Sequence, residues 1–289
     1  MIIDLENEKM SISEALFIAK EYDVILLENK TYNEEVIIDK PHLTFKGKEN
    51  TKISLDLWSS KIDVRTGKKL GTSGSAVVKV LESANNTTFE SIIFENSHIK
   101  NKEDEGEQAV AFKTSASFTL IKNCKFYSFQ DTLYIDNGYM NLVMDSYIEG
   151  DIDFVFGSSD CLFYNVKLAA KTTNINSFYT APSTYAQNRY GFVFKNSKLY
   201  QLNDTKSYLG RPWYPSSAIS PSIPKLSFID CNLYGNIELD YIKMNEHDPN
   251  YHRLSIINSK LNDNLINNVN EINYDEYIDK VLKYFKGIN

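Results

Sequence analysis

Several residue types are scarce in this sequence, and each scarcity excludes a class of protein. The 289 residues include only 12 Gly and 7 Pro, too few for a collagen-like or low-complexity chain. The three cysteines cannot all pair with one another, and their spacing matches neither a disulfide framework nor a zinc site. We therefore expect Cys124, Cys161 and Cys231 to be small buried side chains.

Positive charge, clustered histidines and long apolar runs are also missing. The formal net charge of −7 argues against a nucleic-acid partner. The four histidines do not group with the cysteines, so we expect no metal ion. No stretch is long and apolar enough to span a membrane, and Met1–Lys20 lacks the features of an export signal. We expect a cytoplasmic protein without a membrane partner, although the mature form of an exported protein would look the same.

A short pattern recurs along the chain: an apolar residue, any residue, Asn or Asp, a small residue, any residue and a second apolar residue. The Asn or Asp stands at positions 96, 123, 145, 165, 196, 230 and 258. One such unit cannot bury its apolar face alone, whereas a stack of units can. Hairpin turns such as Asn-Gly, which a β-sandwich would favour, are nearly absent. The pattern therefore predicts an all-β parallel solenoid whose small residues point inward: Ser97, Cys124, Ser146, Val166, Ser197, Cys231 and Ser259.

Both ends of the chain are predicted to be helical. Ser11 and Glu14 form a capping box ahead of an apolar stripe, which predicts a helix over about residues 11–22 that covers the open first coil. Apolar residues at helical spacing predict a second helix over about residues 274–286. No linker composition separates the ends from the middle, so we expect a single domain over residues 1–289.

Four polar side chains recur at an interval that suits one coil of such a solenoid. Gln108 and Gln130 are 22 residues apart, and so are Asp131 and Asp153. On adjacent coils, about 4.8 Å apart, the two amides and two carboxylates would lie in one patch. Paired carboxylates beside amide donors are suited to acyl transfer from an ester.

The same four residues stand in a set of longer motifs. The chain contains Gln-Ala-Val-Ala at 108–111, Gln-Asp-Thr-Leu at 130–133, Asp-Phe-Val-Phe-Gly at 153–157 and Leu-Gly-Arg-Pro-Trp at 209–213. In this order the motifs resemble those of the pectin methylesterase family, over about residues 10–245. The resemblance implies a single-stranded right-handed parallel β-helix that removes methyl groups from galacturonate esters without a cofactor. Its partner would be methyl-esterified homogalacturonan or oligogalacturonides, and we expect a monomer.

The resemblance also implies a role for each matched residue. Asp153 would be the nucleophile and Asp131 the general acid and base, with Gln108 and Gln130 as the oxyanion hole. Arg211 would orient Asp153 and lower its pKa, whereas a neighbouring negative charge and burial would raise the pKa of Asp131. The substrate cleft would be lined by Trp213, Phe156, Thr72, Tyr134 and Met244.

Two departures from the family and two other functions are to be weighed. Lys30 stands where the family has Gly, and Asp240-Tyr241 replaces its usual Gly-Trp, which affects the subsites formed there.

The chain could be another carbohydrate-active enzyme, but a glycosidase needs carboxylates that flank a glycosidic bond and a lyase needs a basic residue and calcium-binding carboxylates. The two glutamines favour ester chemistry instead. A non-catalytic carbohydrate-binding β-helix would tolerate loss of the acid, the base or Arg211, and all three are present.

Overall fold

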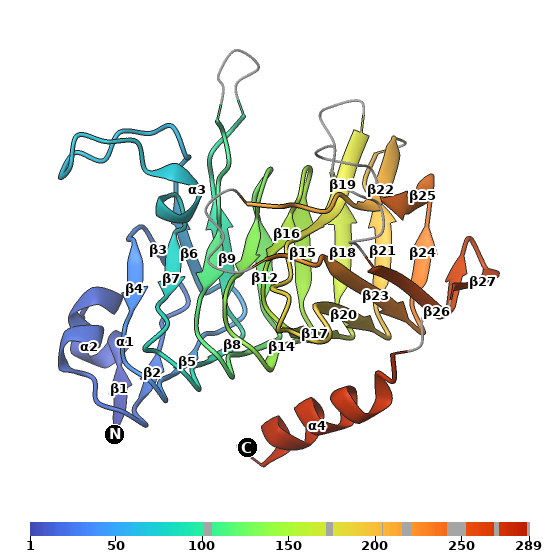
Figure 1. The fold of residues 1–289 in the computed structure, drawn as a ribbon. Helices are drawn as coiled ribbons and strands as arrows, with labels where there is room; N and C mark the ends of the chain where they lie inside the picture. Colours follow the sequence, from blue (N-terminus) through green and yellow to red (C-terminus); the bar gives the residue numbers. More distant parts are fainter. Residues whose placement is uncertain are drawn as a thin grey trace.

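The computed structural model describes residues 1–100, 106–171, 176–203, 205–215, 221–241, 253–268 and 272–287. In these residues the chain winds into coils that contribute up to three short strands each (Figure 1). Equivalent strands of successive coils pair in parallel and form three stacks along one axis. The predicted right-handed parallel β-helix is confirmed.

The strands of the three stacks alternate along the chain. The first stack contains β1 (Ile2–Asp4), β2 (Val24–Leu26), β5 (Thr44–Lys46), β8 (Thr88–Glu90), β11 (Leu120–Lys122), β14 (Asn141–Met144), β17 (Cys161–Tyr164), β20 (Phe192–Lys195), β23 (Lys225–Ile229) and β26 (Arg253–Leu261). The second contains β3 (Thr31–Tyr32), β6 (Lys52–Leu55), β9 (Ile93–Asn96), β12 (Lys125–Tyr127), β15 (Tyr147–Gly150), β18 (Lys167–Ala170), β21 (Lys198–Gln201) and β24 (Asn232–Tyr234). The third contains β4 (Val36–Ile38), β7 (Val78–Val80), β10 (Phe112–Thr114), β13 (Leu133–Ile135), β16 (Val155–Gly157), β19 (Asn176–Pro182), β22 (Lys206–Gly210) and β25 (Ile237–Tyr241). At the C-terminal end, β26 also pairs antiparallel with β27 (Asn264–Asn268).

The interior of the β-helix is filled by apolar side chains that align from coil to coil. Phe163, Phe194 and Phe228 stack on three successive coils, with ring centroids 4.4 and 5.0 Å apart. One cluster of buried apolar residues extends in this way from Ile3 to Ile256. Burial of large aromatic groups at each layer is what makes a stack of otherwise unstable coils stable.

The turn between the first and second stacks is built by the predicted Asn and Asp residues. These residues adopt the left-handed conformation that Asn and Asp tolerate, at 123, 145, 165, 196, 230 and 258. The small residue that follows each of them is buried, and the hydroxyl of Ser146 accepts a hydrogen bond from the backbone N–H of Cys124 on the next coil at 3.1 Å. The inward stacking is therefore confirmed for six of the seven repeats, and all three cysteines are buried and unpaired.

The prediction is wrong for the repeat around Asn96. In the observed register Phe94 pairs with Phe126, which places the turn of this coil at Ser91, with a φ of 59°. Ser97 is therefore exposed and does not join the inward stack. Asn96 is buried for a different reason: its side-chain amide donates to three backbone carbonyls of loops beside the third stack.

The predicted N-terminal helix is present but shorter than expected. The segment contains α1 (Leu5–Glu8) and α2 (Ile12–Ile18), which cover the first coil (Figure 1). The expected capping box starts α2, and the carboxylate of Glu34 accepts hydrogen bonds from two further backbone N–H groups at the same end. The helix ends at Ile18, since the backbone at Ala19 is extended, and the ammonium group of Lys40 donates to the carbonyl oxygens of Leu16 and Ala19 at this end.

The predicted C-terminal helix is α4 (Asp275–Lys286), and its apolar stripe packs as expected. It does not cap the last coil but lies along the outer face of the first stack (Figure 1). Its buried side chains, among them Tyr277, Val281 and Phe285, contact one apolar residue from each of β11, β14, β17, β20 and β23. Among the described helices, none combines the length and the apolar character needed to cross a membrane.

Candidate active site

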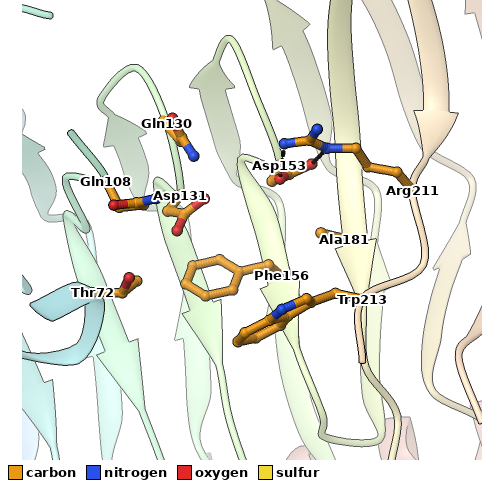
Figure 2. A pocket seen from close by; sticks show the side chains of 9 residues that line it. All are labelled: Thr72, Gln108, Gln130, Asp131, Asp153, Phe156, Ala181, Arg211 and Trp213. Atoms are coloured by element: carbon orange, nitrogen blue, oxygen red, sulfur yellow. Dashed lines mark hydrogen bonds and ion pairs between the residues drawn. The ribbon is translucent and has the colours of Figure 1, made fainter. Parts of the chain in front are cut away.

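The predicted polar residues come together at one edge of the third stack. They line a pocket of about 180 Å³ together with apolar side chains (Figure 2). The lining residues are Thr72, Gln108, Gln130, Asp131, Asp153, Phe156, Ala181, Arg211 and Trp213. All five residues predicted to be catalytic are in this set, although their individual roles stay predictions.

The two carboxylates occupy equivalent positions on neighbouring coils. Gln130 forms a parallel bridge with Ile152, and the backbone N–H of Asp131 donates to the carbonyl of Ile152 at 3.0 Å. Asp131 and Asp153 are therefore one strand spacing apart along the axis, about 4.8 Å. Both residues adopt the left-handed conformation, with φ of 64° and 52°, two positions before the first residue of β13 and of β16. Asp tolerates this conformation, so the two acidic residues take equivalent backbone positions without a glycine.

Among the described residues, only one of the two carboxylates forms an ion pair. The guanidinium group of Arg211 donates to both oxygens of Asp153, from Nε at 2.7 Å and from Nη2 at 2.6 Å. Arg211 is itself held in place, because its backbone N–H donates to the carbonyl of Thr180 and its guanidinium lies over the ring of Phe178 at 4.6 Å. A bidentate pair of this kind fixes the orientation of the carboxylate as well as its charge.

Burial raises the pKa of both carboxyl groups, but not equally. At Asp153 the hydrogen bonds and charge of Arg211 oppose the effect of burial and limit the rise in pKa. From the sequence we expected Arg211 to bring this pKa below its ordinary value. That expectation is wrong, because desolvation is the larger effect. At Asp131 the negative charge of Asp153 adds to burial and holds the pKa well above its ordinary value. The rise in pKa is therefore larger at Asp131 than at Asp153.

The two glutamines direct their amide nitrogens toward the space beside Asp131 (Figure 2). The side-chain oxygen of Gln108 lies 2.6 Å from the hydroxyl of Ser59, which also contacts the carbonyl oxygen of Gly106, so the single hydroxyl proton is shared between two acceptors. The backbone N–H of Ser59 also donates to the carbonyl of Gln108 at 2.9 Å, so this loop is docked on the segment that carries the glutamine. Because its oxygen is engaged outside the pocket, Gln108 presents N–H donors to the pocket.

Sequence reasoning missed Ser59, since no motif includes it. It lies 49 residues before Gln108, and only the fold brings the two side chains together. Ala181, which also lines the pocket, was missed as well; it pairs with Phe156 on the neighbouring strand.

Aromatic rings form the apolar wall of the pocket. Phe156 and Trp213 lie with their ring centroids 6.1 Å apart, and Thr72 faces the same space from α3 (Gly71–Gly74) (Figure 2). Tyr134 does not line the pocket directly; its ring stacks on Phe156 at 4.0 Å and supports that side chain. The predicted Met244 lies outside the described residues.

Comparisons with known proteins identify the family of this chain. The sequence matches the family model described as Pectinesterase over residues 4–223. It is 29% identical to Pectinesterase A of Dickeya dadantii over 255 residues, which cover 80% of this chain and 68% of that protein. It is 34% identical to Pectinesterase 31 of Arabidopsis thaliana over 199 residues, which cover 66% of this chain and 60% of the plant protein.

Solved structures resemble the fold over nearly the whole chain. The pectin methylesterase from Yersinia enterocolitica has a TM-score of 0.82 and 28% identity, over 93% of this chain and 95% of that one. Pectin methylesterase PemA from Erwinia chrysanthemi has a TM-score of 0.83 and 24% identity, over 97% and 96% of the two chains. At the latter identity the likeness concerns the fold alone.

Proposed function

This chain belongs to the pectinesterase family, and from that membership we propose that it removes methyl groups from galacturonate esters of pectin or methylated oligogalacturonides and releases methanol. The observation that carries the mechanism is the asymmetry of the acid pair. Asp131 and Asp153 occupy equivalent positions on adjacent coils, and only Asp153 is bound by Arg211. One carboxyl group is thus prepared to be ionised and the other to hold a proton.

In the first step the carboxylate of Asp153 attacks the carbonyl carbon of the methyl ester. Negative charge develops on the carbonyl oxygen, and the N–H groups of Gln108 and Gln130 stabilise it. The bond from carbon to the methoxy oxygen then breaks, and Asp131 gives its proton to that oxygen, so that methanol leaves as a neutral molecule. The galacturonate unit remains joined to Asp153 as an acid anhydride.

In the second step water hydrolyses the anhydride. Asp131, now ionised, takes a proton from a water molecule, and the oxygen of that water attacks the carbonyl carbon of the galacturonate unit. The bond to Asp153 breaks, and its carboxylate is restored in contact with Arg211. The product leaves as galacturonic acid, which ionises in solution, and Asp131 is protonated again.

The apolar wall suits the body of the substrate. Phe156 and Trp213 offer flat faces against which the C–H groups of a pyranose ring can pack, and the polar groups opposite face the ester. An ester carries no charge, so the substrate has no need of a cation in the pocket, and Arg211 is free to bind Asp153.

The Asp153→Asn variant tests the proposal. We expect it to lose methanol release from methylated galacturonate oligomers while its thermal unfolding stays close to that of the wild type, because an amide can still accept and donate at this position but is no nucleophile. A fully active Asn variant would contradict the assignment of the nucleophile.

The same assay separates the other candidate functions. A glycosidase would produce new reducing ends, a lyase would produce unsaturated sugars, and a carbohydrate-binding protein would produce neither. Methanol release by the wild type without either product is the expected result.

A further inference from the structure

A second groove lies on the outer face of the second stack, away from the acid pair. It encloses about 520 Å³ and shares no lining residue with the pocket that contains Asp131 and Asp153. Its walls come from β12, β15, β18 and β21, which lie side by side in Figure 1. The lining includes three tyrosines and two lysines, namely Tyr127, Tyr147, Tyr200, Lys125 and Lys167.

The lysines of the groove belong to a column that follows the axis of the β-helix. Lys125 pairs with Tyr147, Tyr147 with Lys167, and Lys167 with Lys198, each on the next coil. Two coils beyond Lys198 the same column reaches Lys260. Cations therefore occupy the first, third, fourth and sixth of six layers, at intervals of one or two strand spacings of about 4.8 Å.

These lysines carry charge that the rest of the protein does not neutralise. Among the described residues, no carboxylate lies within ion-pair distance of Lys125, Lys167 or Lys198, and all three are exposed. Lys260 at the end of the column is also exposed and without an ion pair among the described residues, whereas Lys171 on the same stack is paired with Glu149 at 2.8 Å.

The acidic groups of the groove are already engaged. Asp145 accepts a hydrogen bond of 2.7 Å from the side chain of Asn165, and Glu149 accepts one of 2.7 Å from the hydroxyl of Tyr147 as well as binding Lys171. The amide of Asn165 is neutral, so Asp145 keeps its charge, and the two lysines and one aspartate of the lining leave a net charge of +1 to face a ligand.

We infer that this groove binds a de-esterified, anionic stretch of galacturonan, extended parallel to the helix axis, at a site separate from the one where the ester is cleaved. Unpaired cations in a row match a linear polymer that bears a carboxylate on each sugar, and the tyrosine rings offer faces for the apolar sides of the sugars. The identity of the polymer rests on the proposed function, because the product of that reaction is such a stretch.

The test uses fully de-esterified oligogalacturonate, long enough to span four coils, as the probe. Binding is measured by calorimetry for the wild type, for the triple variant Lys125→Gln, Lys167→Gln, Lys198→Gln, and for a matched control. The control is Lys280→Gln, Lys283→Gln, Lys286→Gln on the exposed side of α4, which removes the same charge elsewhere. We expect the groove variant to bind about tenfold more weakly at low salt, as three exposed charge pairs would produce, and the control to bind as the wild type does.

A second measurement on the wild type needs no variant. Carbodiimide joins carboxylates of the bound probe to nearby lysine ammonium groups, and peptide mass spectrometry locates the joined residues. Coupling concentrated on Lys125, Lys167 and Lys198 supports the site. Coupling spread evenly over the surface, or equal loss of binding in the two triple variants, overturns it.

The two proposals fail separately. Probe binding requires no turnover, so a protein that releases no methanol but binds through the groove contradicts only the proposed function. Normal methanol release with no binding at the groove contradicts only the present inference. Equal binding of single-stranded DNA of matched charge through the same lysines would overturn the assignment to galacturonan.

Discussion

At the scale of single residues, the site contains two acids of the same type that differ in their contacts. Asp131 and Asp153 have the same chemistry, the same backbone conformation and nearly the same burial. The bidentate contact of Arg211 limits the rise in the pKa of Asp153, whereas the charge of Asp153 adds to the rise at Asp131. In the same way, one hydroxyl decides which end of the Gln108 amide faces the pocket.

The contact between Ser59 and Gln108 leads to a prediction about turnover. In the Ser59→Ala variant the amide of Gln108 loses the group that holds its oxygen, so we expect kcat for methanol release to fall about tenfold, less than the 10²–10³ typical for loss of an oxyanion donor itself. KM should change little, because Ser59 does not line the pocket. Steady-state kinetics on a methylated oligomer measures both constants.

Two further variants separate positioning from general damage. Ser59→Thr keeps the hydroxyl and is expected to restore most of the lost kcat. In a Gln108→Ala background the Ser59→Ala change should have no further effect, since the group that it positions is gone. Additive losses in this double-mutant cycle would contradict the positioning role.

At the scale of elements, the third stack determines where the acid pair stands. Each acid is a left-handed residue two positions before a strand, and the parallel pairing of β13 and β16 places the two acids at equivalent positions on successive coils. β16 ends at Gly157, whose φ is +131°, a conformation that L side chains rarely adopt. A Cβ atom there would lie 2.0 Å from the carbonyl oxygen of Ile135 on the neighbouring coil.

The Gly157→Ala variant is therefore expected to destabilise the fold and to disturb the neighbouring Phe156. We expect a loss of about 2–4 kcal/mol in the free energy of unfolding, from backbone strain and from the clash with β13 together. Denaturant unfolding measures it. The control is Gly287→Ala, where φ is −79° and an added Cβ meets no atom closer than 3.6 Å. Equal stability of the two variants would show that β16 can shift at no cost.

At the scale of the whole molecule, the site is maintained at the expense of stability. Asp131 is buried, and its pKa is held well above the ordinary value of 3.8 by desolvation and by the charge of Asp153. Below pH 3.8 the group is protonated in both the folded and the unfolded chain and has no effect on their balance. As pH rises through the interval between 3.8 and the raised pKa, only the unfolded chain releases the proton, so the folded state loses stability.

The Asp131→Asn variant removes this pH-dependent loss, because an amide does not ionise. We expect its melting temperature to exceed that of the wild type by an amount that grows with pH across this interval and then stays constant, while methanol release is lost. Thermal unfolding at a series of pH values measures the difference. A difference independent of pH, or one that grows toward acid, would mean that the pKa of Asp131 is not raised.

Some features of the fold could be predicted from short sequence patterns, and others could not. The turn residues from Asn123 to Asn258 identified the coils because each coil repeats the same local requirement, a left-handed turn followed by a small buried side chain. Asn96 matched the same pattern, but its side-chain amide donates a hydrogen bond to a loop and forms no turn of this kind. The turn of that coil is at Ser91, which is neither Asn nor Asp. The contact of Lys40 with the end of α2 was not predictable either, since Lys40 and Leu16 are 24 positions apart in the sequence.

The sequence by itself determined the parallel β-helix, the terminal helices and the acid and amide residues of the site, because these follow from patterns within one coil or from motifs of a few adjacent residues. Only the tertiary structure decided the contact of Ser59 with Gln108, the position of α4 along the first stack and the column of unpaired lysines. The physical reason is that coils differ in length. Residues that contact each other on neighbouring layers are separated by 22 positions in one place and 49 in another. Which residues make contact is determined by the backbone hydrogen bonds between coils, and these form only in the folded chain.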